Sequence, residues 1–141
     1  MAMSIIGMER LKRKLARIPD TVKKRAQTDL MLAGREINMR QRTFVPVDDG
    51  TLRASIRTEP LTDGTVGVSV AAGGPTTTKP VRNSEKGNAP TYDYAMAIEY
   101  GTKDAAPKSF FWPGYKLGKR KAMSRARTGI RRAMREAVKN G

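Results

Sequence analysis

The sequence predicts an α+β domain, in which helices at both ends of the chain pack on a small, mostly antiparallel sheet. Apolar residues recur with helical spacing in two N-terminal segments and in one C-terminal segment. Between them, two short stretches alternate apolar and polar residues around a turn sequence, which is typical of a β-hairpin. A chain of 141 residues is long enough for one domain with a modest core. We therefore expect a single domain over residues 1–141.

Two helices are expected in the N-terminal third of the chain. The first covers about residues 4–17, where apolar residues recur with helical spacing, and Pro19 ends it. The second covers about residues 21–42, with Asp20 as its N-cap. An apolar stripe along one side of a helix is typical of burial against a core. The stripe of the second helix consists of Val22, Ala26, Leu30, Ala33 and Ile37.

A turn and a hairpin are expected next. Pro46 ends the second helix, and Asp48-Asp49-Gly50 is a typical turn sequence. Apolar and polar residues then alternate over residues 52–56, as in a half-buried strand. The segment Thr62-Asp63-Gly64-Thr65 is typical of a hairpin turn, and a second alternating stretch follows it. These features predict a hairpin over about residues 51–72.

The rest of the chain is expected to hold a long loop and a terminal helix. Residues 73–91 are rich in Gly, Pro, Thr, Ser and Asn, which predicts a loop that is either functional or mobile until it orders against a neighbour. Residues 92–101 fit either a strand or a short helix. The rings of Phe110-Phe111-Trp112 belong either to the core or to an interface. Helical spacing returns over about residues 114–139, with Ala122, Ala126, Ile130, Ala133 and Ala137 on one side.

The charge is strongly positive and unevenly distributed. With 28 Lys and Arg against 13 Asp and Glu, the net charge is +15. Counting along the sequence gives 11 basic and 4 acidic residues in 1–43, 7 and 8 in 44–115, and 10 and 1 in 116–141, or +7, −1 and +9. A nearly neutral middle therefore lies between two basic segments. Such a chain favours anionic partners, which are nucleic acid or an acidic protein surface.

Few residues are suited to catalysis. The sequence has no histidine, the usual general base near neutral pH, and no cysteine, which excludes disulfides and thiolate metal sites. Asp48, Asp49 and Glu99 form the one acidic group worth testing as a magnesium site, but Asp-Asp-Gly is first a turn sequence. Ser55 and Ser109 have no histidine to activate them. We therefore expect no enzyme activity, no catalytic or metal-binding residues and no cofactor.

The basic C-terminal helix is the natural candidate for contact with an anion. Lysines and arginines on a helix neutralise phosphates without reading base sequence. A solvated face, or a face docked on an acidic protein, explains the same charges equally well. Interleaved aromatic residues would favour stacking on single strands, and only Tyr115 qualifies. The residues expected to contact DNA or an acidic partner are Lys119, Arg120, Arg125, Arg127, Arg131, Arg132 and Arg135.

Three segments, read together, resemble a known family. They are Pro-Val-Asp-Asp-Gly-Thr-Leu-Arg-Ala-Ser-Ile at 46–56, Tyr-Ala-Met-Ala-Ile-Glu-Tyr-Gly-Thr at 94–102 and Ser-Phe-Phe-Trp-Pro-Gly at 109–114. Their order and spacing are similar to those of the tail-completion, or head–tail joining, proteins of long-tailed bacteriophages. The Gly-x-x-x-Leu segment at 7–11 fits the helix with which members begin, so the resemblance covers roughly residues 5–135.

The chain also departs from this family at three points. Asp49 stands where members usually have Thr, which is a mild change within a turn. Ser109–Trp112 stands where members usually have Pro-Phe before the terminal helix. That helix is unusually basic here, which puts the partner of the helix in question rather than the fold.

The resemblance implies a structural virion protein that forms a ring at the head–tail junction, as a neck, tail-completion or tail-terminator subunit. It implies copies of the chain itself as partners, in a homo-oligomeric ring expected to be hexameric, together with head-connector and tail-tube proteins. It also implies non-specific contact with double-stranded DNA in the channel, no membrane, and assembly in the host cytoplasm before the subunit takes its place in the virion neck. The alternative is a nucleic-acid-binding module that uses its basic helices.

Two sets of residues follow from these interpretations. Gly50 and Gly101 permit backbone shapes that other residues resist, so the turns around them are expected to determine the fold. The aromatic cluster is expected to anchor contact between subunits. The fold-determining residues are Pro46, Asp48, Gly50, Glu99, Gly101 and Thr102, and the interface residues are Tyr94, Phe110, Phe111 and Trp112.

Overall fold

The fold is known from a computed structural model that describes residues 2–4, 19–46 and 49–140. It has the predicted α+β class, with helices toward both ends and small antiparallel sheets between them. The helix expected over about residues 4–17 lies almost wholly outside the described residues, as does Asp48. Ser4 belongs to a strand, β1 (Ala2–Ser4), so the start of that predicted helix is wrong.

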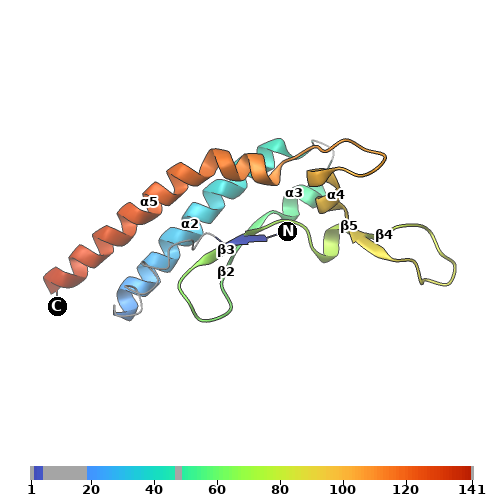
Figure 1. Cartoon of the computed structure of the whole chain (residues 1–141). Helices are drawn as coiled ribbons and strands as arrows, with labels where there is room; N and C mark the ends of the chain where they lie inside the picture. Colours follow the sequence, from blue (N-terminus) through green and yellow to red (C-terminus); the bar gives the residue numbers. More distant parts are fainter. Residues whose placement is uncertain (1, 5–18, 47–48, 141) are drawn as a thin grey trace.

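The described part of the chain is elongated and built in layers (Figure 1). Two long helices, α2 (Asp20–Phe44) and α5 (Phe111–Asn140), lie side by side and run in opposite directions. Helix α2 also packs on a sheet of β1, β2 (Arg57–Pro60) and β3 (Val68–Ala71). Helix α2 is therefore the middle layer, and α5 is an outer layer that rests on it (Figure 1).

Small residues allow α2 and α5 to approach closely. The predicted stripe of α2 is buried from Val22 to Ile37, and the stripe of α5 is buried from Ala122 to Ala133. At the upper end of the pair, a Cβ atom added to Gly114 would lie 2.4 Å from the Cα atom of Gln41. That distance leaves no room for any side chain. The burial of the two predicted apolar stripes is thus confirmed except at Ala137, which is half-buried.

The three-stranded sheet is antiparallel and has the order β1-β3-β2. Met3 and Thr58 lie on either side of Val70 in the register. Val68 and Val70 are fully buried and belong to the same core as the α2 stripe. Because side chains alternate along a strand, this places one face of the central strand against α2.

The predicted hairpin is present but starts later than expected, and its first predicted strand is wrong. Residues 50–55 form a short helix, α3 (Gly50–Ser55), whose N-cap Asp49 accepts a hydrogen bond from the backbone N–H of Leu52 at 2.9 Å. Leu52 and Ile56 are buried while Ala54 is exposed. A spacing of four suits a helix as well as an alternating pattern suits a strand, and the Asp cap decides between them. The hairpin is formed by β2 and β3 instead.

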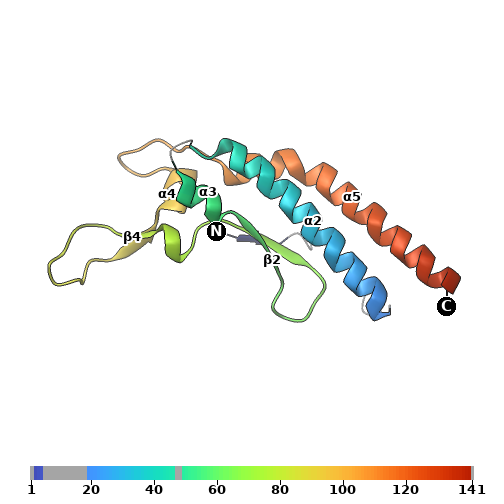
Figure 2. The same cartoon turned by 180° about the vertical axis from the view of Figure 1, so that it is seen from behind.

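The segment expected to be a loop over 73–91 is partly regular. It contains a 3₁₀ turn, η1 (Pro75–Thr77), and β4 (Thr78–Pro80), which pairs with β5 (Thr91–Asp93). The ribbon of β4 and β5, with the residues between them, projects away from the body of the molecule (Figure 2). We call residues 78–93 the arm.

Residues 92–101, whose sequence fits either a strand or a short helix, contain both. The first of these residues complete β5, and the helix α4 (Tyr94–Tyr100) follows directly. Helix α5 begins at Phe111, three residues earlier than the sequence predicted, with Pro113 in its first turn. Proline is tolerated there because the N–H groups of the first turn have no partner within the helix.

The contact between α2 and α5 gives a direct test of this fold. Gly114→Ala is expected to lower the free energy of unfolding by about 2 kcal/mol, because its Cβ atom would press on the α2 backbone. Chemical denaturation measures the change. Gly50→Ala is the control, since nothing lies within 4 Å of its Cβ position, and its effect is expected to be neutral or stabilising by up to about 1 kcal/mol. Equal effects of the two substitutions would contradict the packing described.

Candidate functional site

A buried carboxylate joins α4 to the start of α5. Glu99 is 2% exposed, and its two oxygens accept hydrogen bonds from three backbone N–H groups, those of Phe110 (2.7 Å), Phe111 (2.8 Å) and Trp112 (3.0 Å). These N–H groups are the ones that a helix leaves without partners at its N-terminus. The negative charge also suits the positive end of the helix dipole. Glu99 therefore works as a cap supplied from another helix.

The connection between these helices covers residues 101–110 and begins at a glycine with a positive φ angle. Gly101 ends α4 with a φ angle of +78°, and a Cβ atom there would lie 2.8 Å from the nitrogen of Pro107. The hydroxyl of Thr102 accepts a hydrogen bond from the N–H of Ala105 at 3.1 Å. Sequence analysis assigned Glu99, Gly101 and Thr102 to one fold-determining turn, and the structure brings all three together here.

Of the residues in the other predicted turn, Pro46 lies in a turn, whereas Gly50 lies in a helix. The carbonyl of Pro46 accepts a hydrogen bond from the N–H of Asp49 at 3.1 Å, so Pro46 does belong to a turn. Gly50 is the first residue of α3, and its φ angle is not positive. The expectation that Gly50 is needed for an unusual backbone shape is therefore wrong. The residue that matters locally is Asp49, the N-cap.

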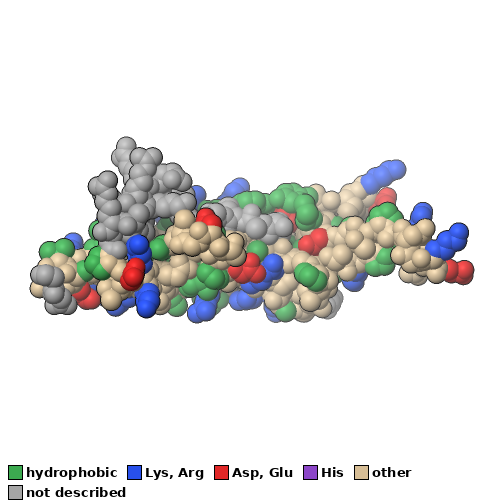
Figure 3. Space-filling model, turned by 90° about the horizontal axis from the view of Figure 1, so that it is seen from below, with side chains coloured by type: hydrophobic (Ala, Val, Ile, Leu, Met, Phe, Trp, Pro, Cys, Tyr) green, Lys and Arg blue, Asp and Glu red, His purple; other side chains and the backbone are tan. Residues whose placement is uncertain are grey.

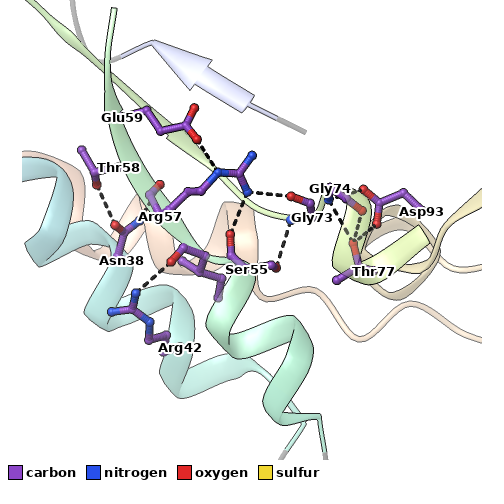
Figure 4. Close-up of polar contacts among 11 residues, drawn as sticks. Asn38, Arg42, Ser55, Arg57, Thr58, Glu59, Gly73, Gly74, Thr77 and Asp93 are labelled. Atoms are coloured by element: carbon purple, nitrogen blue, oxygen red, sulfur yellow. Dashed lines mark hydrogen bonds and ion pairs between the residues drawn. The ribbon is translucent and has the colours of Figure 1, made fainter. Parts of the chain in front are cut away.

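A second carboxylate fixes the root of the arm (Figure 4). Asp93 accepts hydrogen bonds from the hydroxyl of Thr77 (2.6 Å) and from the backbone N–H groups of Gly74 (3.1 Å) and Ala95 (2.9 Å). The last of these makes Asp93 the N-cap of α4. Gly73 leaves room for this carboxylate, since a Cβ atom there would lie 2.3 Å from it. Asp93 thus joins η1, β5 and α4.

Arg57 extends this network to the sheet (Figure 4). Its guanidinium donates to the carbonyls of Ser55 (2.9 Å) and Gly73 (2.6 Å) and forms an ion pair with Glu59. The hydroxyl of Ser55 accepts a hydrogen bond from the N–H of Gly73 at 3.0 Å. The planar guanidinium suits this role because it presents several donors in one fixed fork. The end of α3 is therefore tied to the end of β3.

Two buried amides on α2 connect the layers on either side of it. The side chain of Asn38 accepts a hydrogen bond from the hydroxyl of Thr58 at 2.6 Å, on β2. The side chain of Gln41 donates to the carbonyl of Phe111 at 3.2 Å, on α5, and the two amides bond to each other at 3.1 Å. Because buried polar groups are costly unless paired, this chain of bonds fixes the register of sheet, α2 and α5.

The aromatic cluster is mainly core, which corrects part of the predicted interface. Phe110 and Phe111 are fully buried, so neither can contact another subunit in this fold. Trp112 and Tyr94 are half-buried; the indole N–H of Trp112 donates to the hydroxyl of Tyr100 at 2.8 Å. Burial, and then the charge of Asp49, raises the pKa of Tyr94 above its ordinary value.

Exposed apolar side chains are found instead on α4 and on the strand that precedes it. Met96 and Tyr100 are one helical turn apart and are 48% and 56% exposed, and Tyr92 on β5 just before the helix is 42% exposed. We call these three residues the α4 patch. Sequence analysis did not single out Met96 or Tyr100 as interface residues. The signal was available in their spacing of four, which puts both on one side of a short helix.

The predicted anion-contacting residues all lie on α5 and are exposed. They do not all share one direction. Arg125 forms an ion pair with Glu36 of α2, so it is turned toward the neighbouring helix. The others have no ion pair among the residues that the structure describes. Most of the predicted basic residues of α5 are therefore available to a partner.

The acidic group considered as a magnesium site does not form one in the described part of the chain. Glu99 has its two oxygens bonded to backbone N–H groups, and Asp49 caps α3. No cluster of three or more potential metal ligands occurs among the described residues. These two carboxylates are instead used to begin helices.

Comparison with known proteins returned nothing: no family model, curated protein or solved structure matches the chain. Among the described helices, none combines the length and the apolar character needed to cross a bilayer.

The capping role of Glu99 can be tested by an isosteric change. Glu99→Gln is expected to lower the free energy of unfolding by about 3 kcal/mol, since it removes the charge and turns an N–H₂ group toward buried N–H donors. Chemical denaturation measures the loss, and hydrogen exchange should show reduced protection in the first turn of α5. Glu59→Gln, in an exposed ion pair, is the control and is expected to cost less than about 1 kcal/mol. A Glu99 variant as stable as this control would refute the role.

Proposed function

We propose that this chain is a structural subunit of a phage-type virion that forms a ring at the head–tail junction. In that position it would join the head connector to the tail tube around the DNA channel. Support comes from two directions. The segments at 46–56, 94–102 and 109–114 resemble those of tail-completion proteins. The α4 patch supplies an exposed apolar surface of the kind that subunits bury against one another.

The α4 patch is the main observation behind the proposal, because α4 is held in place at both of its ends. Helix α4 is capped at its start by Asp93, and Glu99 near its end is bonded to three N–H groups of α5. A short helix held at both ends presents its side chains with little freedom left to lose on binding. Exposed methionine and tyrosine side chains are also typical of protein interfaces.

The arm supplies a second surface, which a ring requires. Subunits in a closed ring use two different surfaces of each copy, one for each neighbour. The arm extends from the body of the molecule, so it can reach a neighbouring copy (Figure 2). It carries Val81, an apolar side chain that is 62% exposed. The Asp93 network fixes the root of the arm, so that its direction is set before assembly.

The test is the mass of the full chain in solution, alone and with the tail-tube protein from the same particle. Ring-sized oligomers are expected, and Met96→Asp is expected to shift them to monomer, because a buried charge at an interface costs several kcal/mol. Leu117→Asp is the matched control, since Leu117 is 64% exposed on α5, away from the patch. If the native chain is a monomer under both conditions, or if both variants behave alike, the proposal fails.

The alternative is a nucleic-acid-binding module, and the basic exterior of α5 favours it. The two functions predict different oligomeric states. A module of this kind binds DNA as a monomer, with an affinity that falls steeply as salt is added. The mass measurement above therefore separates a module from a ring subunit.

A further inference from the structure

One row of cations on α5 faces away from the rest of the molecule. Lys116, Arg120, Arg127, Arg131 and Arg135 are all exposed. At 3.6 residues per turn, they lie within about 100° of the helix circumference, and the middle of this sector is about 130° from the middle of the buried stripe that packs on α2. With a rise of 1.5 Å per residue, the row is about 28 Å long. We call these five residues the outer row.

Among the residues that the structure describes, no acidic side chain forms an ion pair with the outer row. Helix α5 has a single acidic residue, Glu136, which lines a surface hollow together with Lys24 and Arg25 of α2. Within the described residues, the ion pairs are Arg57 with Glu59 and Arg125 with Glu36, and neither involves the row. The row is therefore a positively charged surface that is accessible to an anionic partner.

The charge is unevenly distributed along the chain. Figure 3 shows acidic, basic and apolar side chains mixed together among the described residues of the face seen from below. By sequence, residues 116–141, nearly all of them in α5, carry the largest local excess of positive charge, +9.

The row has the composition of a phosphate-binding surface rather than of a protein interface. Protein interfaces draw affinity from apolar anchors that lose their water. Two methionines of this stretch, Met123 and Met134, pack against the core, whereas Leu117 is exposed at the edge of the row and lines a hollow with Met39 of α2. Four of the five cations in the row are arginines, whose forked guanidinium suits phosphate oxygens.

The row also favours a duplex over a single strand. Single-strand binding uses exposed aromatic rings on which bases stack. Tyr115, the aromatic residue closest to the row in sequence, is half-buried, and its ring packs edge-on against Trp112 at 5.9 Å between centroids. A straight row of cations instead suits duplex DNA, which presents about one phosphate charge per 1.7 Å of its axis.

We propose that the outer row of α5 binds the phosphate backbone of double-stranded DNA without sequence preference. The assignment of that DNA to a virion channel rests on the proposed function, whereas binding by the isolated chain does not. In a ring subunit, the outer layer formed by α5 would then line the conduit.

The test compares two triple variants that remove equal charge. Arg127→Gln, Arg131→Gln and Arg135→Gln remove three of the five charges of the row, and Arg53→Gln, Lys103→Gln and Lys108→Gln change exposed cations outside both α5 and the arm. Glutamine keeps the helix propensity of α5. The probe is a 25-base-pair duplex of mixed sequence, followed by fluorescence anisotropy over a series of salt concentrations. The row variant is expected to lower the salt slope by about 2.7, at about 0.9 per lost phosphate contact, and to weaken binding more than tenfold.

The control triple is expected to change affinity by less than about threefold, as for charges that do not touch the phosphates. Equal losses from the two triples would overturn the proposal, because only net charge would then matter. Displacement of the duplex by polyglutamate at equal charge concentration would also overturn it, in favour of an acidic protein partner. Circular dichroism and native mass are measured on the same samples. If the row variant keeps its oligomeric state but loses DNA binding, the loss is due to the outer row and not to disassembly of a ring. The two proposals can therefore fail independently.

Discussion

The fold depends on the burial of one carboxylate. Glu99 reaches from α4 to the first turn of α5 and accepts three backbone N–H groups there. Without it, the buried end of a 30-residue helix would have unpaired donors beside Phe110 and Phe111. The same contact fixes where α5 begins and hence how it lies on α2. The position of the basic outer layer therefore follows from an acid in the neutral middle of the chain.

A second carboxylate, that of Asp93, fixes the position of the exposed apolar surface. It caps α4 and binds η1, so the arm and the α4 patch share one rigid base. In the proposed assembly, rigidity at this point would favour binding, because a surface that is already ordered loses little entropy when it binds. The two carboxylates thus pair the backbone N–H groups around them, and the surfaces proposed for partners lie outside these two networks.

The sequence predicts the long elements well and the short ones poorly. Apolar stripes on α2 and α5 extend over several turns, so their period is unambiguous and their burial follows. Residues 50–56 are too few to distinguish a helix from a strand by pattern, and the Asp49 cap decides for the helix. Glu99 was assigned to a turn from its motif, but its partners lie eleven or more residues away, beyond what local pattern reveals. Phe110 and Phe111 illustrate the same limit, since adjacent rings fit a core and an interface equally well until the neighbouring layers are known.

The central claim is that this chain completes its structure by assembling with copies of itself around a DNA conduit. Electron microscopy of the particle that contains the chain tests this most directly. The account predicts a closed ring of this subunit at the junction of head and tail, with α4 patches buried between neighbours and α5 toward the axis. A particle that carries the chain as isolated monomers, or in any position away from the junction of head and tail, would contradict it.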